Sequence, residues 1–429
     1  MVDKSFVGCA RRYRCLSSSS LEVRRVSRRW TLRRRAHKVI VEPLREFLQA
    51  ESAGGIVLLI AAVVAMVWAN SPASGAYQAL WDTELTLGTG PLAPSHDLRG
   101  WVNDGLMVLF FFVIGLEIKR ELITGELREP RVAVLPAMAA AGGVVFPAVI
   151  FFGIVGTGEG AAGWGIPVAT DIAFAVGVLA VLGSRIPAGV KVFLVSVAIV
   201  DDIIAIVIIA VFYSESISLG WLGAAAIALA AVLALRWFGV GAVWPYAVIG
   251  MGVWYATDFS GVHATIAGVA LGLLTPARPV GGREVLHELE HRLHPVTAFA
   301  VVPLFALANA GVDLRGGVLA DAASSRVAWG VAVGLVVGKT LGIGLVTLLA
   351  QRTRVASLPA GVATGQVWGI AALAGIGFTV SLFIAELAYT DPALVDHAKV
   401  GIFAGSAVGA ALGVTLLLWT ARRSLEAKR

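Results

Sequence analysis

The sequence predicts an all-α polytopic membrane protein with about twelve transmembrane helices, and three observations support this fold class. First, 58% of the 429 residues are hydrophobic and only 14% are charged, whereas a soluble domain carries roughly 25% charged residues. Second, apolar runs of roughly 20 residues, enough to cross the hydrocarbon core as a helix, recur along the chain. Third, the 49 glycines are many for helices in water but suit closely packed membrane helices.

Residues 1–42 are predicted to form a basic cytoplasmic tail, with ten arginines and two lysines against two acidic residues in 1–38. The tail has no long apolar core, so it does not resemble an ordinary signal peptide. Three interpretations stay open: a tail that contacts anionic lipid, a nucleic-acid arm, or upstream sequence from a start codon assigned too early. Both cysteines, Cys9 and Cys15, lie here, so no disulfide is expected in the membrane part.

The transmembrane domain is predicted over residues 43–421, followed by a cytoplasmic tail at 422–429. Its apolar runs are separated by short polar links. No zinc spacing, nucleotide-binding loop or haem motif is present, so we expect no cofactor and no enzymatic activity. The predicted spans lie near 54–69, 102–122, 132–155, 163–182, 188–213, 219–235, 242–256, 259–274, 295–311, 327–350, 358–385 and 398–420.

The Lys and Arg residues predict the orientation of these spans. An even number of spans puts both termini on one side, and cytoplasmic links are the basic ones. Alternate links, starting with the one that holds Lys119 and Arg120, contain twelve Lys or Arg residues, and both tails are also basic. Both termini are therefore predicted to be cytoplasmic. The opposite links hold only Arg99, Arg315, Arg326 and Lys399.

Two of the spans carry residues that interrupt a helix. The fourth has Pro167 and Asp171 at mid-membrane, and the eleventh has Gly375 and Gly377 beside Thr379. Backbone groups freed by such breaks must face protein or water, and half-helix ends near the midplane attract charge. Each broken span is the centre of a three-span set, 3–5 or 10–12, and the two sets enter from opposite sides. This layout predicts inverted repeats that cross near a central ion site.

The link after the first span is predicted to be extracytoplasmic. The Thr/Leu alternation from Thr83 to Leu87 suggests a strand, and the Gly-Thr-Gly-Pro that follows suggests a turn. A hairpin at this place would allow two copies to pair as a homodimer. An irregular loop remains the alternative.

The adjacent carboxylates Asp201 and Asp202 lie in the middle of the apolar run 188–213. On insertion scales one such charge costs about 3 kcal/mol at the helix centre. Lys339 is the only Lys or Arg at membrane depth in the predicted spans, and a lone buried ammonium needs a carboxylate partner. The partners available at depth are Asp171, Asp201, Asp202 and, nearer a span end, Asp104. The pair and the lysine together predict an ion site.

Several motifs, in order along the chain, resemble the NhaA family of sodium/proton antiporters. The resemblance runs from about Pro43 to the end of the twelfth span and leaves out the basic tail. Its most specific parts are WVNDGLMVLFFFVIGLEIKREL, ATDIAFAVGVL, AIVDDIIAI, SGVHATIAG, LEHRLHP and GIGFTVSLFI.

The resemblance implies roles for individual residues. Asp202 would bind Na⁺ or Li⁺ and release protons, while Asp201, its partner in the metal site, pairs with Lys339. One departure is visible, because Thr340 follows Lys339 where the family is expected to have proline, which leaves the local helix shape open. The remaining matches are Thr170 and Asp171 at the broken fourth span, Asp104 in an extracytoplasmic funnel, and Glu117, Glu290, His291 and His294 on a cytoplasmic face associated with pH activation.

The chemistry of these residue types agrees with that implication. Sodium is a hard cation that prefers oxygen ligands, and burial disfavours the charged form of a carboxylate, which therefore competes for protons. One site that holds either sodium or protons, with alternating access, exchanges intracellular Na⁺ or Li⁺ for external H⁺. If Lys339 loses its proton when Asp201 is freed, it carries a second proton and transport is electrogenic. The resemblance places such a protein in a bacterial inner membrane, with lipid but no nucleic acid as a partner.

Alternatives remain for single residues. Lys339 either carries a proton or has a structural role in which it only neutralises charge. The carboxylate pair is either an ion site or a structural acid cluster. Thr170 is either a ligand or bonded back to the preceding turn. Asp171 is interpreted mainly as electrostatic scaffolding, Asp104 as a funnel or interfacial acid, and His263 as a packing residue.

Other functions also remain for the whole chain. A sodium-coupled solute symporter would use the same scaffold, although an acid-rich midplane disfavours anionic cargo. An intramembrane aspartyl protease would need Asp171 and Asp202 as a dyad, but Thr170 and Asp201 occupy the preceding positions where that family has other residues. A structural subunit of a larger pump is the third alternative.

Overall fold

The computed structural model describes residues 42–90, 93–214, 217–280 and 282–426. Contacts divide the chain into two units, Met1–Ala50 and Glu51–Arg429. Of the first unit only the beginning of helix α2 (Glu42–Ala69) is described, so nearly all of the predicted basic tail, including both cysteines, lies outside the described residues. The second unit holds all the other elements.

The first half of the second unit is helical except for one small hairpin. The hairpin strand predicted around Thr83–Leu87 is confirmed, because β1 (Glu84–Thr86) pairs antiparallel with β2 (Ser95–Asp97). The helices are α3 (Ser74–Trp81), α4 (Leu98–Gly100), the π-helical η2 (Trp101–Leu106), α5 (Met107–Ile123), η3 (Glu126–Arg128), α6 (Pro130–Val155), the 3₁₀ segment η4 (Glu159–Val168), α7 (Ile172–Leu182), η5 (Gly183–Arg185) and α8 (Ala188–Phe212).

The second half is wholly helical apart from its connecting loops and one isolated β-bridge. Its elements are α9 (Leu219–Trp237), α10 (Val243–Asp258), α11 (Thr265–Leu274), α12 (Val285–Val296), the π-helical η6 (Thr297–Val301), α13 (Val302–Asn309), η7 (Arg315–Gly317), α14 (Val318–Ser324), α15 (Arg326–Val333), the π-helical η8 (Gly334–Gly338), α16 (Lys339–Arg352), α17 (Thr364–Leu373), α18 (Phe378–Ala388) and α19 (Pro392–Glu426).

The predicted all-α membrane class is confirmed. Among the described residues, seven helices are long and apolar enough to cross a bilayer, or up to nine if each of two bent pairs counts as one span. The twelve-span count stays a prediction, because α10 has 16 residues and α11 only 10. The predicted start of the eighth span at 259 is wrong. Residues from Ser260 to Val262 form a turn around Gly261, whose positive φ of 79° interrupts the helix, and α11 begins at Thr265.

Both predicted breaks are present. The fourth span consists of η4 and α7 with extended backbone at Ala169 and Asp171 between them. The eleventh consists of α17 and α18, whose axes are bent by 46° across the residues that include Gly375 and Gly377. In each case a residue that disfavours a continuous helix lies in an otherwise apolar run.

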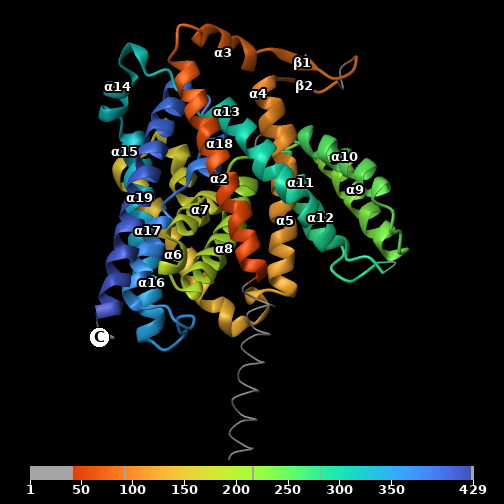
Figure 1. The fold of residues 1–429 in the computed structure, drawn as a ribbon. Helices are drawn as coiled ribbons and strands as arrows, with labels where there is room; N and C mark the ends of the chain where they lie inside the picture. The colour runs from red at the N-terminus through yellow and green to blue at the C-terminus, as the bar shows by residue number, and fades with distance from the viewer. Residues whose placement is uncertain (1–41, 91–92, 215–216, 281, 427–429) are drawn as a thin grey trace, which may run out of the picture. The chain divides into compact units, whose positions relative to one another are not determined.

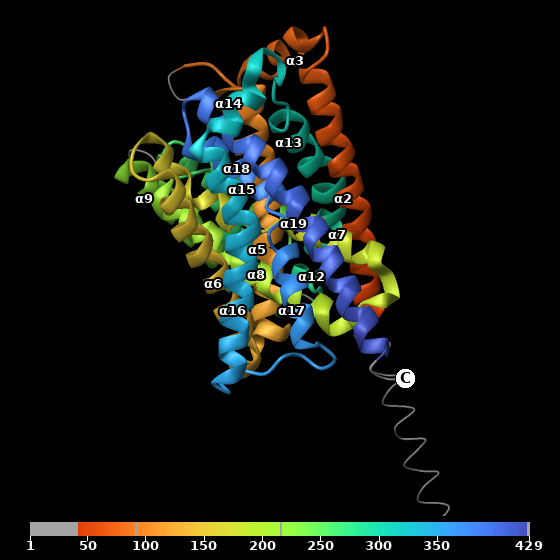
Figure 2. The same ribbon diagram turned by 90° about the vertical axis from the view of Figure 1, so that its left-hand side faces the viewer.

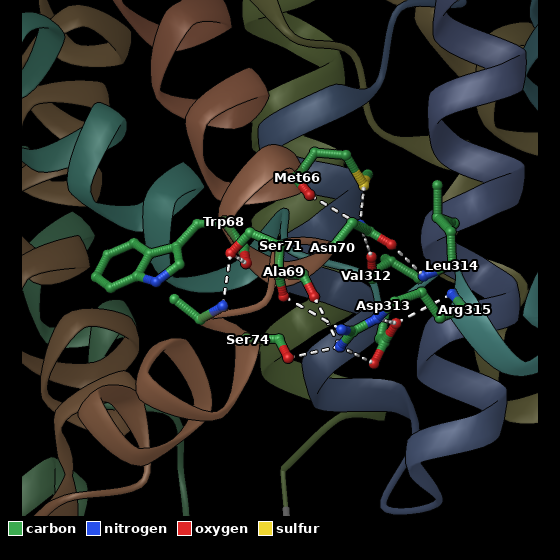
Figure 3. A network of polar contacts seen from close by, with 11 residues as sticks. Met66, Trp68, Ala69, Asn70, Ser71, Ser74, Val312, Asp313, Leu314 and Arg315 are labelled. Atoms are coloured by element: carbon green, nitrogen blue, oxygen red, sulfur yellow. Dashed lines mark hydrogen bonds and ion pairs between the residues drawn. The ribbon is translucent and has the colours of Figure 1, made fainter.

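Figures 1 and 2 show α3 and α14 at one end of the second unit and the C-terminal end of α16 at the other. We call the first, which also carries β1 and β2, the hairpin end, and the second, where α5 also finishes, the opposite end. At the hairpin end a polar network joins the turn after α2 to the segment before α14 (Figure 3). Arg315 donates to Ala69 O and Ser71 O there, and Asn70 Nδ2 donates to Val312 O.

Glycine allows α6 and α16 to approach closely next to Lys339. A Cβ atom on Gly142 of α6 would lie 2.5 Å from Gly342 O of α16, and a Cβ on Gly342 would meet Gly142 O in turn. The same part of α6 contacts the lysine, since a Cβ on Gly143 would lie 3.6 Å from Lys339 Cδ. This contact therefore fixes the helix that carries Lys339 against α6.

Candidate functional site

The adjacent carboxylates lie midway along α8 and are both buried, with 1% of Asp201 and 6% of Asp202 exposed. Neighbouring helical residues point about 100° apart, so the two side chains enter different surroundings. Asp201 faces α16, and Asp202 faces other acidic groups. This difference between adjacent residues defines the site.

Asp201 is half of a fully buried ion pair. Lys339 Nζ donates to Asp201 Oδ2 at 2.6 Å, and no part of Lys339 is exposed. The lysine is the first residue of α16, directly after the π-helical η8, and π segments are frequent at functional sites. The helix continues from η8 into α16 at Thr340, where the family is expected to have proline. The Thr340 hydroxyl and Asp201 Oδ1 are both buried and have no hydrogen-bond partner among the described residues.

The two broken spans are joined where they cross. Thr170 Oγ1 donates to Ala374 O at 2.8 Å, and Asp171 N donates to Ile376 O at 2.6 Å. The Asp171 carboxylate accepts from Thr379 N at 3.0 Å and from Thr379 Oγ1 at 2.5 Å. It also caps α7 by accepting from Phe174 N. Asp171 therefore connects the starts of α7 and α18.

Asp202 is placed differently. It accepts no hydrogen bond from any described residue, and the charged groups around it are mostly acidic. Asp201, Asp171 and Glu117 act on it as like charges, and Lys339 is the compensating cation. A carboxylate in such surroundings is stabilised by a proton or a bound cation. The two carboxylates therefore differ, because Asp201 is paired with Lys339 and Asp202 has no such ion pair among the described residues.

The residues predicted for pH activation have different surroundings in the structure. Glu117 acts electrostatically on Asp202, whereas Glu290 is 7% exposed and pairs with Arg120 Nη1. His291 is exposed and its ring stacks on His287 with 6.2 Å between centroids. His294 is partly buried, and its carbonyl accepts from Thr297.

Asp104 lies in η2, close to the hairpin end. Its carbonyl accepts from Trp254 Nε1 at 2.7 Å, and its carboxylate interacts electrostatically with His263, His96 and Asp258. His263 itself bonds Tyr213 O through Nε2 at 2.5 Å. Asp104 therefore belongs to a separate cluster near the hairpin, and among the described residues it forms no hydrogen bond or ion pair with Asp201 or Asp202.

Sequence reasoning missed several polar contacts. Lys399 was assigned to a link, yet it is inside α19, 2% exposed, and its ammonium lies 2.7 Å from Glu386 Oε1 of α18. Tyr389, directly after α18, donates to Gly160 O, and Tyr213, directly after α8, donates to Ala162 O, so both hold η4 in place. In the sequence, the only indication of these contacts is that each side chain lies next to an apolar run.

Comparison with known proteins gives a consistent result. Residues 45–417 match the family described as Na⁺/H⁺ antiporter 1. The chain is 47% identical over 380 residues to Na⁺/H⁺ antiporter NhaA 2 of Erythrobacter litoralis (strain HTCC2594), covering 88% of this chain and 94% of the relative. It is 46% identical over 377 residues to the NhaA of Serratia proteamaculans (strain 568), covering 87% and 97%. The NhaA 1 of Klebsiella pneumoniae subsp. pneumoniae is 47% identical over 384 residues, covering 89% and 97%.

Proposed function

The chain belongs to the NhaA-type Na⁺/H⁺ antiporter family, and on that premise we propose that it exchanges intracellular Na⁺ or Li⁺ for external H⁺ at Asp202 and Asp201. As a member of this family it is a multi-pass membrane transporter and not an enzyme, and it needs no cofactor. The cation and the protons are the proposed transported ions and not cofactors. A bacterial inner membrane is the proposed location.

One observation carries the proposal. Of two adjacent buried carboxylates, Asp201 is occupied by Lys339 at 2.6 Å, while Asp202 accepts no hydrogen bond from any described residue. No group of three or more His, Cys, Asp or Glu side chains in the described part of the chain is placed to hold a metal ion. A sodium ion at Asp202 would therefore complete its oxygen ligands from hydroxyls such as Thr170, freed carbonyls and water.

Competition at this site couples the two gradients. Protons on Asp202 exclude Na⁺, and Na⁺ displaces the proton, so each ion crosses only in exchange for the other. When a cation draws Asp201 away, Lys339 loses the charge that stabilises its ammonium and gives up a proton. Two protons then move for each Na⁺, and the exchange transfers net charge. Alternating access, with the crossed half-helices as its centre, completes the cycle.

We also propose that the Arg120–Glu290 pair and the neighbouring histidines regulate exchange by pH. Glu290 is buried, its Oε1 is held by Arg120, and its Oε2 has no hydrogen-bond partner among the described residues. Histidine changes charge in the neutral range, and His287 and His291 stack on the same helix. Glu290→Gln should therefore shift the pH profile of exchange without abolishing it at its optimum.

Flux measurements in liposomes test the central proposal. The purified chain would be reconstituted and the lumenal pH followed with a fluorescent probe as NaCl, LiCl or KCl is added between pH 6 and 9. We expect proton flux with Na⁺ and Li⁺, none with K⁺, and none in Asp202→Asn. Asp321→Asn, an exposed acid on α14, is the matched control and should exchange as the wild type does.

The result also separates the alternatives. Exchange by Asp202→Asn at the wild-type rate would make the carboxylate pair structural. Absence of flux in the wild type at every pH would favour a sodium-coupled symporter or a subunit of a larger pump. Flux that builds up a membrane potential, measured with a potential-sensitive dye, tests the two-proton stoichiometry.

A further inference from the structure

A second buried ion pair lies away from the carboxylate site, between α18 and α19. Lys399 Nζ lies 2.7 Å from Glu386 Oε1, and 3% of the lysine side chain and 17% of the glutamate side chain are exposed. Among the described residues two lysines are buried, Lys399 and Lys339, and each is paired with a carboxylate. Ionisable groups within membrane-spanning segments are costly and indicate a functional role. The exchange chemistry at Asp202 does not use the pair of Lys399 and Glu386.

The acid of this pair lies where its helix disfavours an acid. Glu386 is in the last turn of α18, and the C-terminal end of a helix carries a partial negative charge. The surroundings hold a further acid, because Asp396 of α19 acts on Glu386 as a like charge. Lys399 and Arg99 act on Asp396 as opposite charges. The stability of α18 alone therefore does not account for a glutamate at this position.

Glu386 and Thr379 lie on the same face of α18. Residues with the spacing i and i+7 share a helix face, and these two residues have that spacing. At the start of the helix, Thr379 N and Thr379 Oγ1 both donate to the Asp171 carboxylate. Asp171 therefore holds the start of α18, and Lys399 holds the same face about two turns further on.

Lys399 is a firm attachment point because α19 packs closely against α15. A Cβ atom on Gly401 of α19 would lie 2.5 Å from Ala328 O of α15, so the two backbones leave little space for a shift. The helix α15 continues through η8 into α16, which begins with Lys339. The ion pair therefore connects the second half of the broken eleventh span to the helices that carry Lys339.

The position of α18 affects the ion site through Asp171. Hydrogen bonds to the ionised form of a carboxylate stabilise that form, and Thr379 supplies two of them to Asp171. Asp171 is one of the like charges that act on Asp202, and negative charge around a carboxylate favours a bound cation. A shift of α18 that breaks the bonds from Thr379 would therefore weaken the attraction of a cation to Asp202.

We propose that Lys399 and Glu386 are positioning residues for cation exchange, because their ion pair holds α18 where Thr379 reaches Asp171. The inference rests on the proposed exchange at Asp202. The pair acts through α18 and Asp171 and not by contact with the transported ion.

The dependence of exchange on Na⁺ concentration in liposomes at one pH tests the proposal. Lys399→Met should raise the apparent KM for Na⁺ about two- to thirtyfold, the range of mutational effects carried between separate sites, with a smaller effect on the maximal rate. Lys399→Arg keeps the charge beside Glu386 and should restore the wild-type KM. Arg326→Met, at an exposed cation that begins α15, is the control and should leave KM unchanged.

A double variant separates positioning from stability. Glu386→Gln with Lys399→Met removes both charges, and replacing a buried ion pair by neutral groups costs little stability. Its melting temperature in detergent should return toward that of the wild type, whereas its KM should stay raised because no ion pair holds α18. Recovery of both quantities together would show that the pair has only a structural role.

Hydrogen exchange of the full chain in detergent, read by mass spectrometry, follows α18 without transport. Peptides from the start of α18 should exchange faster in Lys399→Met and in the double variant than in the wild type and Lys399→Arg, because Thr379 N loses its acceptor. This pattern in a protein whose wild type shows no Na⁺ flux would support the link from Lys399 to α18 and overturn the exchange at Asp202. Wild-type flux with equal KM and equal hydrogen exchange in every variant would overturn the positioning role alone, and would assign it to Tyr389 and its bond to Gly160 O.

Discussion

At the scale of single residues, the ion pair between Asp201 and Lys339 carries a large desolvation cost. Both groups are buried, and desolvating two charges offsets much of their attraction. Breaking such a pair from one side leaves a charge without compensation, which is worse than removing both charges. The pair is therefore difficult to explain by stability alone, and the proposed proton exchange would give it a function.

We predict that Asp201→Asn destabilises the protein by about 3–5 kcal/mol, because the Lys339 ammonium is left buried and unpaired. Replacing both residues, as Asp201→Asn with Lys339→Met, should recover most of that loss. The midpoint of thermal unfolding in detergent measures both effects. Asp202→Asn should unfold near the wild-type temperature, since it removes repulsion among acids and breaks no ion pair. Equal stability of Asp201→Asn and the double variant would show that the lysine has another partner.

At the scale of elements, the hairpin is attached to α10 through a titrating contact. His96 of β2 lies 3.3 Å from Asp258 at the end of α10, and its ring contacts Trp101 edge-on. The hydrogen bond that His96 donates to the Asp258 carboxylate raises the pKa of His96 above its usual value near 6.5. Burial opposes this shift, and the nearby charges of Asp104 and Asp97 add to it. Because the pKa is raised in the folded protein, the contact stabilises fully below pH 6.5. It weakens as the pH rises through the raised pKa.

We predict that the backbone amides of β1 and β2 are better protected from hydrogen exchange below pH 6.5 than above the raised pKa of His96. Rates corrected for intrinsic exchange and compared with those of His96→Gln measure the effect. In Asp258→Asn the pKa of His96, followed by NMR, should fall toward or below 6.5. Protection that does not change with pH in the wild type would mean that the hairpin is held by Trp101 alone, through its bond to Leu85 O.

The contact between α6 and α16 is the second feature at this scale. We predict that Gly342→Ala destabilises the protein by about 1–3 kcal/mol, because the new Cβ would meet the Gly142 carbonyl and separate the helices. The same shift should move Lys339 and lower the exchange rate. Gly153→Ala, also on α6 but with nothing within 4 Å of its Cβ, is the matched control. Equal activity and melting of the two variants would show that α16 relaxes without displacing Lys339.

At the scale of the whole molecule, the sequence predicts features that depend on local chemistry. The breaks were predictable because Pro167, Gly375 and Gly377 interrupt apolar runs, and Lys339 had to find a buried acid. The confirmed all-α membrane class follows from composition. The domain limits, the homodimer and the inverted repeats remain predictions, because no observation tests them.

Features that depend on which helices are neighbours were not predictable. Nothing in the sequence around Glu290 shows that Arg120 is its partner, 170 positions away. Lys399 was misplaced for the same reason, since a lysine near the edge of an apolar run looks exposed until Glu386 of α18 is placed beside it.

The orientation of the molecule in the membrane is a prediction at this largest scale. The hairpin end carries few basic residues, among them Arg99 and Arg315, whereas the opposite end carries Lys119, Arg120 and Arg236. Basic links are retained on the cytoplasmic side. We therefore predict that the opposite end faces the cytoplasm, where both termini are also predicted to lie, and that the hairpin is extracytoplasmic.

Single cysteines at the two ends test this orientation in a variant with Cys9→Ser and Cys15→Ser. Thr86→Cys on β1 and Thr353→Cys after α16 are both exposed positions. A membrane-impermeant thiol reagent applied to spheroplasts should label Thr86→Cys, and should reach Thr353→Cys only after the membrane is opened. Labelling in the reverse order would invert the molecule and put Asp104 on the cytoplasmic side of the ion site. Labelling of both positions from outside would require an even number of spans between residues 86 and 353, whereas the predicted nine spans put them on opposite sides.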